Sequence, residues 1–470
     1  MSYCIYIGKN LTADGRAYLA GYGDEPSSHW LEIVPRAQHS AESTITVGVT
    51  PEAMMPGLRS EIPQAAETAR HIRVSYSFYR GVPSPITNGG LNEYGVAVRD
   101  IWSPSRDELK QMTPTDQTGP NYSDLARLVL ERARTAREGV GLIGELIAKH
   151  GYSTYGGNSH FIADHTEGWV VIEFAGGAGL WVAERISPDE IRVSRPGYVN
   201  PFLPDANPEY ILHSPNLISF AVEQGWYDAD SGQPFNVNTV YGDGKGRWDG
   251  VRWMESEMRR RAKLPEKVGL TDAMWAVRTH YLTGDTAGYG QVVPLEPRQH
   301  SELGVLWHAA SGAVATPFAP VFIGTGDVPV EFKQHRYLTT NEDSRFVDSR
   351  HEDATPSVVP QLQEASRSAV RAVKRLMYLL LAHPEEMLPE ATALFEAFEG
   401  KLIEQMNGMV KSAEILLDAN ETTLAEQLLT YFSHTELLNA LSLVETLTAH
   451  YELRSRLTLP QVANRPKQVW

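Results

Sequence analysis

The stretch that decides the fold is the opening of the chain, MSYCIYIGKNLTADGRAYLAGYGDE, which spans residues 1–25. Residues 5–7 (Ile-Tyr-Ile) form a short β-branched and aromatic run that ends at Gly8, as is typical of a strand. Asp-Gly at residues 14–15 marks a turn, and the apolar residues 17–21 predict the returning strand. The sequence therefore predicts an N-terminal β-hairpin.

Mixed strand and helix patterns, with many Gly and Pro turns, continue to about residue 335. Three apolar runs predict further strands, at 95–98, 161–164 and 169–174. Helical spacing predicts a helix from residue 123 to 151, with a break near residues 139–141, and a second helix at 253–263.

The pattern changes in the C-terminal part of the chain, where glycine becomes rare after Pro360. Apolar residues at three- and four-residue steps predict four helices there, at 361–382, 385–418, 421–432 and 435–454. We therefore predict a mixed domain at residues 1–335 and an α-helical region at residues 336–470 that packs on it. The helical region is also a candidate interface for a homo-oligomer.

The composition excludes several classes of protein. The 470 residues are 42% hydrophobic and 21% charged, which is ordinary for a globular chain. A net charge of −16 repels phosphate backbones, so we expect no nucleic-acid partner. No stretch approaches the ~18 apolar residues of a membrane span, and the single cysteine, Cys4, excludes a disulfide scaffold. The opening residues lack the pattern of a signal peptide, so we expect a cytoplasmic location.

Short motifs follow the hairpin in a fixed order, namely NGGLNEYGV at 88–96, GNSH at 157–160 and WVAER at 181–185. Together with the first 25 residues, this ordered set resembles the cysteine-type dipeptidase family of the N-terminal nucleophile hydrolases. It resembles choloylglycine hydrolases, penicillin V acylases and secernins more distantly. The resemblance implies an α+β fold, an αββα sandwich of two stacked antiparallel sheets between helices.

The resemblance also implies a chemistry, amide-bond hydrolysis of small dipeptides with no metal and no organic cofactor. A serine or cysteine at the first position can use its own α-amine, whose reference pKa is about 8, as the general base. Attack forms an acyl-enzyme, the amine leaves, and water completes turnover. This mechanism requires that everything before the nucleophile is removed.

Two residues compete for the role of nucleophile. Counting back from Gly8 places the family's cysteine on Ser2, and removal of Met1 alone would expose it. Cys4 would require the loss of residues 1–3, although a thiol is the better nucleophile near neutral pH. Because the two residues have equal parity, they face the same way on a strand. A chain without a working nucleophile is the third alternative.

Other catalytic candidates come from positions that match the family. Asp24 matches an aspartate that contacts the nucleophile and its amine in relatives, whereas the family's arginine falls on Gly21. Asn92 and Asn158 are candidate oxyanion donors, although either could instead stabilise a turn. Arg252 lies where relatives carry an active-site arginine and could bind a substrate carboxylate, or form a surface salt bridge.

Three functional hypotheses therefore stay open. The first is a dipeptidase. The second is an acylase or acyltransferase acting on N-acyl amino acids or related amides, because pocket loops decide the acyl and leaving groups. The third is a catalytically silent scaffold, which the glycine at position 21 and the displaced Cys4 favour.

Overall fold

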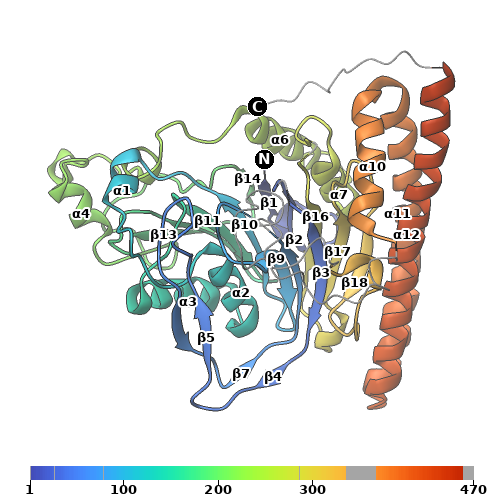
Figure 1. Ribbon diagram of the computed structural model, residues 1–470, viewed down its shortest axis with the longest axis horizontal. Coiled ribbons are helices and arrows are strands. Elements are labelled where there is room, and N and C mark those ends of the chain that lie inside the picture. The colour runs from blue at the N-terminus through green and yellow to red at the C-terminus, as the bar shows by residue number, and fades with distance from the viewer. Residues whose placement is uncertain (1, 26, 78, 285, 335–366, 459–470) are drawn as a thin grey trace.

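The computed structural model describes residues 2–25, 27–77, 79–284, 286–334 and 367–458 (Figure 1). Two antiparallel sheets form its centre. The first sheet has six strands, in the order β14 (Ile191–Ser194), β1 (Tyr3–Ile7), β2 (Ala17–Gly23), β16 (Tyr289–Leu295), β17 (Val305–Ala310) and β18 (Ala319–Phe322). The predicted hairpin is confirmed, because β1 and β2 pair antiparallel with Cys4 opposite Gly21.

The second sheet has eight strands. Their order is β15 (Ile211–His213), β13 (Trp181–Ile186), β12 (Gly168–Glu173), β11 (Asn158–Ala163), β10 (Ala97–Trp102), β9 (Ile86–Asn92), β8 (His71–Tyr76) and β3 (His29–Val34). Two small pairs lie apart from it, β4 (Ala37–Gln38) with β7 (Glu67–Thr68), and β5 (Thr44–Val47) with β6 (Ser60–Pro63).

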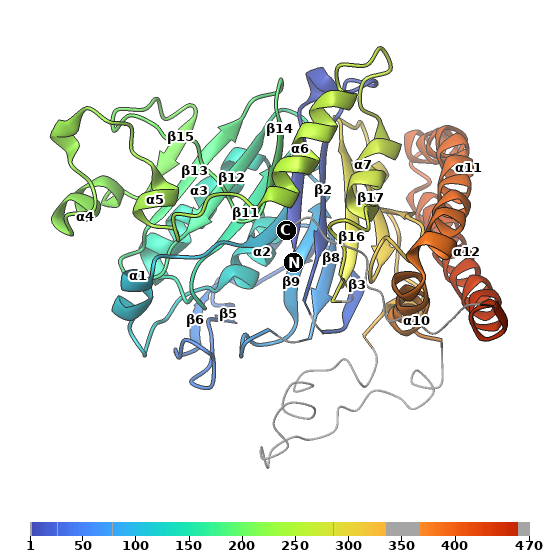
Figure 2. The same ribbon diagram turned by 90° about the horizontal axis from the view of Figure 1, so that it is seen from above.

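Helices cover the outer faces of both sheets (Figure 2). On the second sheet lie α2 (Tyr122–Arg132) and α3 (Ala136–His150), and on the first lie α6 (Asp249–Arg261) and α7 (Leu270–Arg278). Apolar side chains of both sheets, such as Leu19 and Phe161, form one core between them. This layering confirms the expected αββα fold. Three short helices lie outside the layers, α1 (Asp107–Met112), α4 (Leu217–Glu223) and α5 (Val237–Val240).

The helix predicted from residue 123 to 151 is divided at a different place from the one expected. The structure breaks it at residues 133–135, where the hydroxyl of Thr135 accepts from the backbone N–H of Glu138 at 3.1 Å and begins a new helix. The predicted break at residues 139–141 is wrong. Gly139 lies inside α3, and its small size lets the helix approach the neighbouring side chains.

Between residues 367 and 458, the C-terminal region forms three helices, α10 (Ala369–Ala382), α11 (Pro384–Asp418) and α12 (Thr422–Thr458). The first packs on β17 and the third on β18 (Figure 1). The break expected between residues 432 and 435 is wrong, because α12 is continuous and Ser433 hydrogen bonds Thr325 at 3.0 Å. The domain boundary expected near residue 335 lies outside the described residues, as does the start of the helix expected from residue 361.

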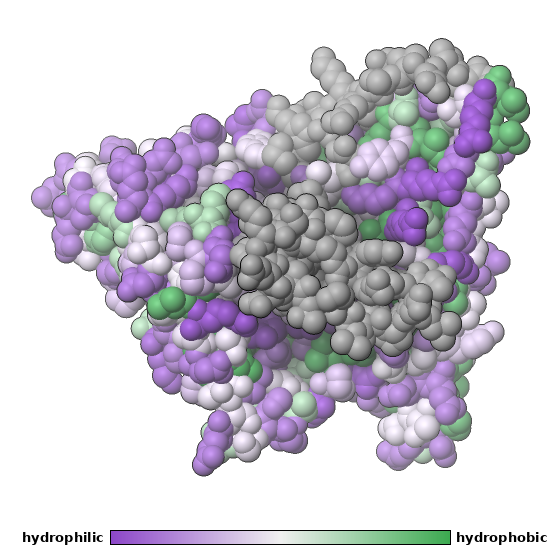
Figure 3. Space-filling view, in the orientation of Figure 1, coloured by the Kyte–Doolittle hydropathy of each residue, from purple (hydrophilic) through white to green (hydrophobic). Residues whose placement is uncertain are grey.

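The surface agrees with the acidic composition. Figure 3 shows hydrophilic residues over most of the visible face, with apolar residues gathered at one end of the C-terminal helices. On α12, Leu453 and Leu457 are exposed. The homo-oligomer interface expected in this region stays a prediction. Within the described ranges, no helix combines the length and apolar character needed to traverse a bilayer.

Candidate active site at the end of the N-terminal hairpin

The register of the hairpin places Ser2 beside the end of β2. Tyr3 pairs with Tyr22, so the residue that precedes β1 lies next to the residues that follow β2. The Ser2 hydroxyl donates a hydrogen bond to Glu25 Oε1 at 2.8 Å and accepts one from the backbone N–H of Asp24 at 3.2 Å. Ser2 itself is almost completely buried. The hydroxyl is therefore held in one orientation between a carboxylate and a backbone donor.

Glu25 links this hydroxyl to a buried imidazole. Its Oε2 lies 3.2 Å from Nε2 of His29, whose Nδ1 faces the backbone carbonyl of Ser27 at 3.0 Å and must donate to it. Burial opposes ionisation of Glu25, but hydrogen bonding and charge from His29, with the charge of Arg99, lower its pKa to about 2. Glu25 is therefore ionised at neutral pH and is a poor proton acceptor.

Arg99, on β10 of the second sheet, supplies the cation that the sequence comparison with the family found missing at Gly21. It is fully buried, and a Cβ on Gly21 would come within 3.2 Å of its Cγ and Nε atoms. Its Nη2 donates to the carbonyl of Tyr22 at 2.7 Å and its Nη1 to that of Asn88 at 2.7 Å. Position 21 itself carries no arginine, but the Arg99 guanidinium reaches from the other sheet into the space beside this glycine.

Asn88, on β9, faces the same place. It is fully buried, and neither atom of its amide has a hydrogen-bond partner in the described part of the chain. A Cβ on Gly23 would lie 3.0 Å from Asn88 Oδ1 and 3.0 Å from Glu25 Oε2, so the amide and the carboxylate converge on one point of β2. A buried amide without partners is costly and calls for an explanation, such as a polar ligand.

Arg195 follows β14 and contacts the nucleophile candidate directly. Its Nη1 donates to the carbonyl of Ser2 at 2.7 Å, and its guanidinium stacks on Trp248 at 4.0 Å. Burial lowers the pKa of Arg195 to about 10. Sequence reasoning missed Arg195, Arg99, Asn88 and Glu25. The only signal was that Glu25 follows the matched aspartate and that Asn88 opens a matched motif.

Two further sequence-predicted residues, Cys4 and Asp24, lie near this cluster. Cys4 is fully buried in β1, its thiol points to the carbonyl of Ala20 at 3.4 Å, and burial raises the pKa of this thiol. The Asp24 carboxylate accepts hydrogen bonds from Tyr22 and Thr286, and its backbone N–H donates to the Ser2 hydroxyl. The carboxylate that accepts from the hydroxyl belongs to the next residue, Glu25.

The two asparagines predicted as oxyanion donors have protein partners. Asn92 Nδ2 donates to the carbonyls of Leu130 and Ala133, at 3.2 and 2.7 Å, and so joins β9 to the end of α2. Asn158 Oδ1 accepts from the hydroxyl of Tyr155 at 2.9 Å. The structure therefore supports the alternative that both residues stabilise local structure.

Arg252 also takes its alternative role. Its side chain is 58% exposed on α6 and forms an ion pair with Asp249, one turn earlier. The structure thus does not bring Arg252 to Ser2, and the arginine that contacts Ser2 is Arg195.

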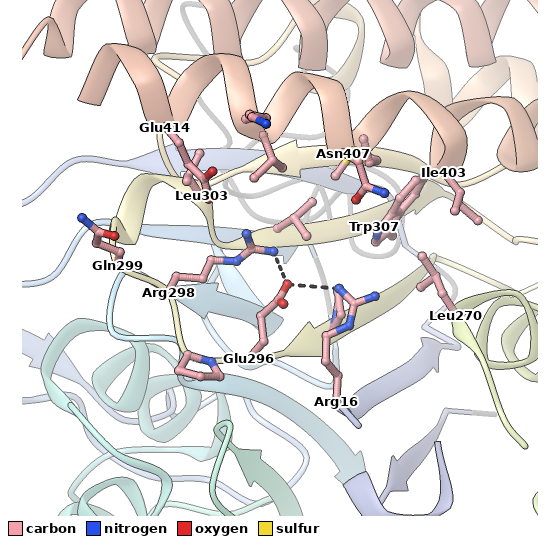
Figure 4. Close-up of a pocket in the computed structure, with 16 residues that line it drawn as sticks. Arg16, Leu270, Glu296, Arg298, Gln299, Leu303, Trp307, Ile403, Asn407 and Glu414 are labelled. Carbon is pink, nitrogen blue, oxygen red and sulfur yellow. Dashed lines mark hydrogen bonds and ion pairs between the residues drawn. The ribbon is translucent and has the colours of Figure 1, made fainter. Parts of the chain in front are cut away.

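A separate cavity of about 500 Å³ lies between α11 and the first sheet (Figure 4). Glu296 is at its centre and binds two arginines, Arg16 at 3.1 Å and Arg298. None of the residues around Ser2 lines this cavity. Across the described residues, no group of three or more His, Cys, Asp or Glu side chains is placed to hold a metal ion.

Comparison with known proteins indicates a class of hydrolase, the peptidases. Residues 89–249, or 161 of the 470, match the model of peptidase family C69. Within this class, the chain is 32% identical over 156 residues to a protein described as a probable dipeptidase from Salmonella dublin. That match covers 32% of this chain and 34% of the relative, so it spans about a third of the relative's length. The matches confirm the resemblance to the dipeptidase family that the motifs indicated.

Solved structures were also found. Two variants of the conjugated bile acid hydrolase from Clostridium perfringens align over 68% of this chain and 92% of theirs. Their sequence identities are 12% and 11%, and their TM-scores 0.30 and 0.32.

Proposed function

We propose that this chain hydrolyses the amide bond of a dipeptide, with Ser2 as the nucleophile after removal of Met1. The observation that carries the proposal is the Ser2 hydroxyl, fixed between the carboxylate of Glu25 and the N–H of Asp24. The partial match to a peptidase family and to a dipeptidase supports the reaction class.

The α-amine of Ser2 is the proposed general base. Glu25, with a pKa of about 2, would hold a proton too weakly to take one from a serine hydroxyl at neutral pH. A terminal amine has a reference pKa of about 8, which is much closer to the working pH. Glu25 then has the role of orienting the hydroxyl and stabilising the ammonium group that forms.

The proposed reaction follows from these roles. Ser2 Oγ attacks the scissile carbonyl carbon while its proton passes to the α-amine, and the carbonyl oxygen becomes an oxyanion. The unpartnered amide of Asn88 is the proposed hydrogen-bond donor to that oxyanion. The ammonium group returns the proton to the leaving amine, and water then hydrolyses the acyl-enzyme with the α-amine again as base.

Ser2 is preferred over Cys4 for two reasons. The Cys4 thiol is fully buried and directed at a backbone carbonyl, and burial favours its neutral form, which is the less reactive one. Cys4 also pairs within the hairpin, so that removal of residues 1–3 would expose a residue already inside β1.

The test combines processing with matched variants. Intact mass and N-terminal sequencing should show loss of Met1 alone, and Ser2→Ala should abolish hydrolysis of a dipeptide panel, by at least about 10⁴-fold. Cys4→Ala is the control and should keep activity within a few-fold. Retention of Met1 in active protein, or activity that depends on Cys4 and survives Ser2→Ala, would overturn the proposal. N-acyl amino acids in the same panel would reveal an acylase.

A further inference from the structure

One buried cation beside Ser2, Arg195, makes no direct ion pair with any of the described residues. Arg195 is 7% exposed and forms no ion pair there, whereas two other buried arginines, Arg99 and Arg278, pair with Asp100 and Glu399. The only hydrogen bond of its side chain in the described part of the chain runs from Nη1 to the Ser2 carbonyl, at 2.7 Å. The charge of Glu25 acts on Arg195 from a distance, but no carboxylate in the ranges that the structure describes contacts the guanidinium. Because a buried charge is costly unless it is paired and hydrogen-bonded, this guanidinium can accept an anionic ligand.

The free side of this guanidinium has a defined direction. Stacking on Trp248 at 4.0 Å, with Trp102 at 6.0 Å, restrains its plane. Because Nη1 is used by Ser2, the edge formed by Nε and Nη2 is left, and Nε is buried without a partner among the described residues. Such an edge matches the two oxygens of a carboxylate.

The position of Arg195 relative to the nucleophile indicates which carboxylate would fit. Arg195 contacts the carbonyl of the same residue whose hydroxyl would attack the substrate. In a dipeptide, the scissile carbonyl and the terminal carboxylate are also separated by a single residue. A dipeptide bound with its carbonyl at Ser2 Oγ can therefore direct its carboxylate to Arg195.

We infer that Arg195 binds the free carboxylate of the substrate's leaving amino acid and so selects dipeptides over longer or amidated peptides. This inference rests on the proposed hydrolase function. It transfers to Arg195 the role that sequence comparison offered for Arg252, which the structure places on the surface.

The decisive measurement compares L-alanyl-L-alanine with its C-terminal amide. We expect kcat/KM of the unaltered protein to favour the free acid by about 100-fold, because the amide cannot form the charge-assisted hydrogen bonds that a carboxylate forms with Arg195. Arg195→Gln should reduce that preference to near one, while Arg195→Lys should keep part of it. Arg195 also holds Ser2, so an equal loss of kcat/KM for both substrates reports on that structural role. Only the ratio of the two kcat/KM values reports on carboxylate binding.

Arg252→Gln is the matched control, since it removes an exposed guanidinium and should leave the ratio unchanged. A second readout does not depend on turnover: calorimetry on Ser2→Ala should show binding of the dipeptide but not of its amide, and Arg195→Gln in that background should abolish the difference. Equal cleavage of both substrates, or a preference that survives Arg195→Gln, would refute the subsite and leave the hydrolase standing. If neither substrate is cleaved, the proposed function fails, and calorimetry alone decides whether Arg195 selects carboxylates.

Discussion

The surroundings of Ser2 and the cavity under α11 both contain arginines and carboxylates, but only one of them is electrostatically complete. In the cavity, Glu296 binds Arg16 and Arg298 (Figure 4). Arg16 also pairs with Asp14. Around Ser2, by contrast, the amide of Asn88 and the Nε of Arg195 are buried without partners among the described residues.

The difference teaches that the size of a cavity is a weaker sign of a functional site than buried polar atoms without hydrogen-bond partners. The cavity has ample volume, yet the carboxylate of Glu296 already pairs with the guanidinium groups of Arg16 and Arg298. The Ser2 cluster holds an amide and one edge of a guanidinium that have no hydrogen-bond partner in the described chain. Buried polar groups of this kind call for an explanation, such as a ligand.

Among variants that keep Ser2, the largest expected effect follows from removing the unpartnered amide of Asn88. We expect Asn88→Ala to lower kcat for dipeptides by about 100- to 1,000-fold with little change in KM, because an oxyanion donor acts on the transition state. Asn407→Ala, which removes an amide from the cavity wall, is the control and should leave kcat unchanged. Full activity of Asn88→Ala in steady-state assays would remove Asn88 from the mechanism.

A somewhat smaller effect on activity is expected from Glu25→Gln, about 100-fold in kcat/KM, because the amide still accepts from Ser2 but lacks the charge that stabilises an ammonium group. This variant also tests the acid dependence of stability. The pKa of Glu25 is lowered from 4.5 to about 2, so its contribution is fully present above pH 4.5 and is lost as the pH falls toward 2.

The free energy of unfolding, measured by denaturant titration across that range, should therefore fall less steeply in Glu25→Gln than in the unaltered protein. Glu414→Gln, at an exposed residue of the cavity, should not change the slope. Identical slopes for Glu25→Gln and the unaltered protein would contradict the lowered pKa.

The contact between Gly21 and Arg99 predicts a loss of stability. A methyl group on Gly21 would lie 2.7 Å from the Tyr3 carbonyl and 3.2 Å from Arg99, so Gly21→Ala should destabilise the fold by about 1–3 kcal/mol. Gly141→Ala is the control, because nothing lies within 4 Å of its added Cβ and alanine favours the helix. Thermal unfolding of the two variants should shift in opposite directions.

The smallest effect is expected in the cavity. Glu296→Gln leaves Arg16 and Arg298 facing each other without their shared carboxylate, so we expect a lower melting temperature and dipeptide hydrolysis within two-fold of the unaltered protein. A ten-fold or greater loss of hydrolysis would show that the cavity and the Ser2 cluster are coupled, and would remove the contrast between them.

Local patterns predicted the architecture well. Local patterns identified the hairpin, the strands at 161–164 and 169–174 and most of the C-terminal helices. These elements could be found because burial makes apolar residues recur at the spacing of a strand or a helix. The misplaced breaks, near residue 139 and residue 433, have a common cause. Glycine in α3 and Ser433 in α12 are accommodated by packing against other elements, which a local pattern does not report.

By itself, the sequence determined the hairpin and the position of Ser2 at its start, because these depend on neighbours along the chain. The layered fold was implied by the resemblance of its motifs to a known family. Only the tertiary structure decided what surrounds Ser2. Arg99, Asn88 and Arg195 come from β10, β9 and the end of β14, and they meet because two sheets stack and strands distant in sequence become adjacent. Whether an arginine such as Arg252 faces the site or the solvent depends on that packing, since arginines occur both beside Ser2 and on the surface.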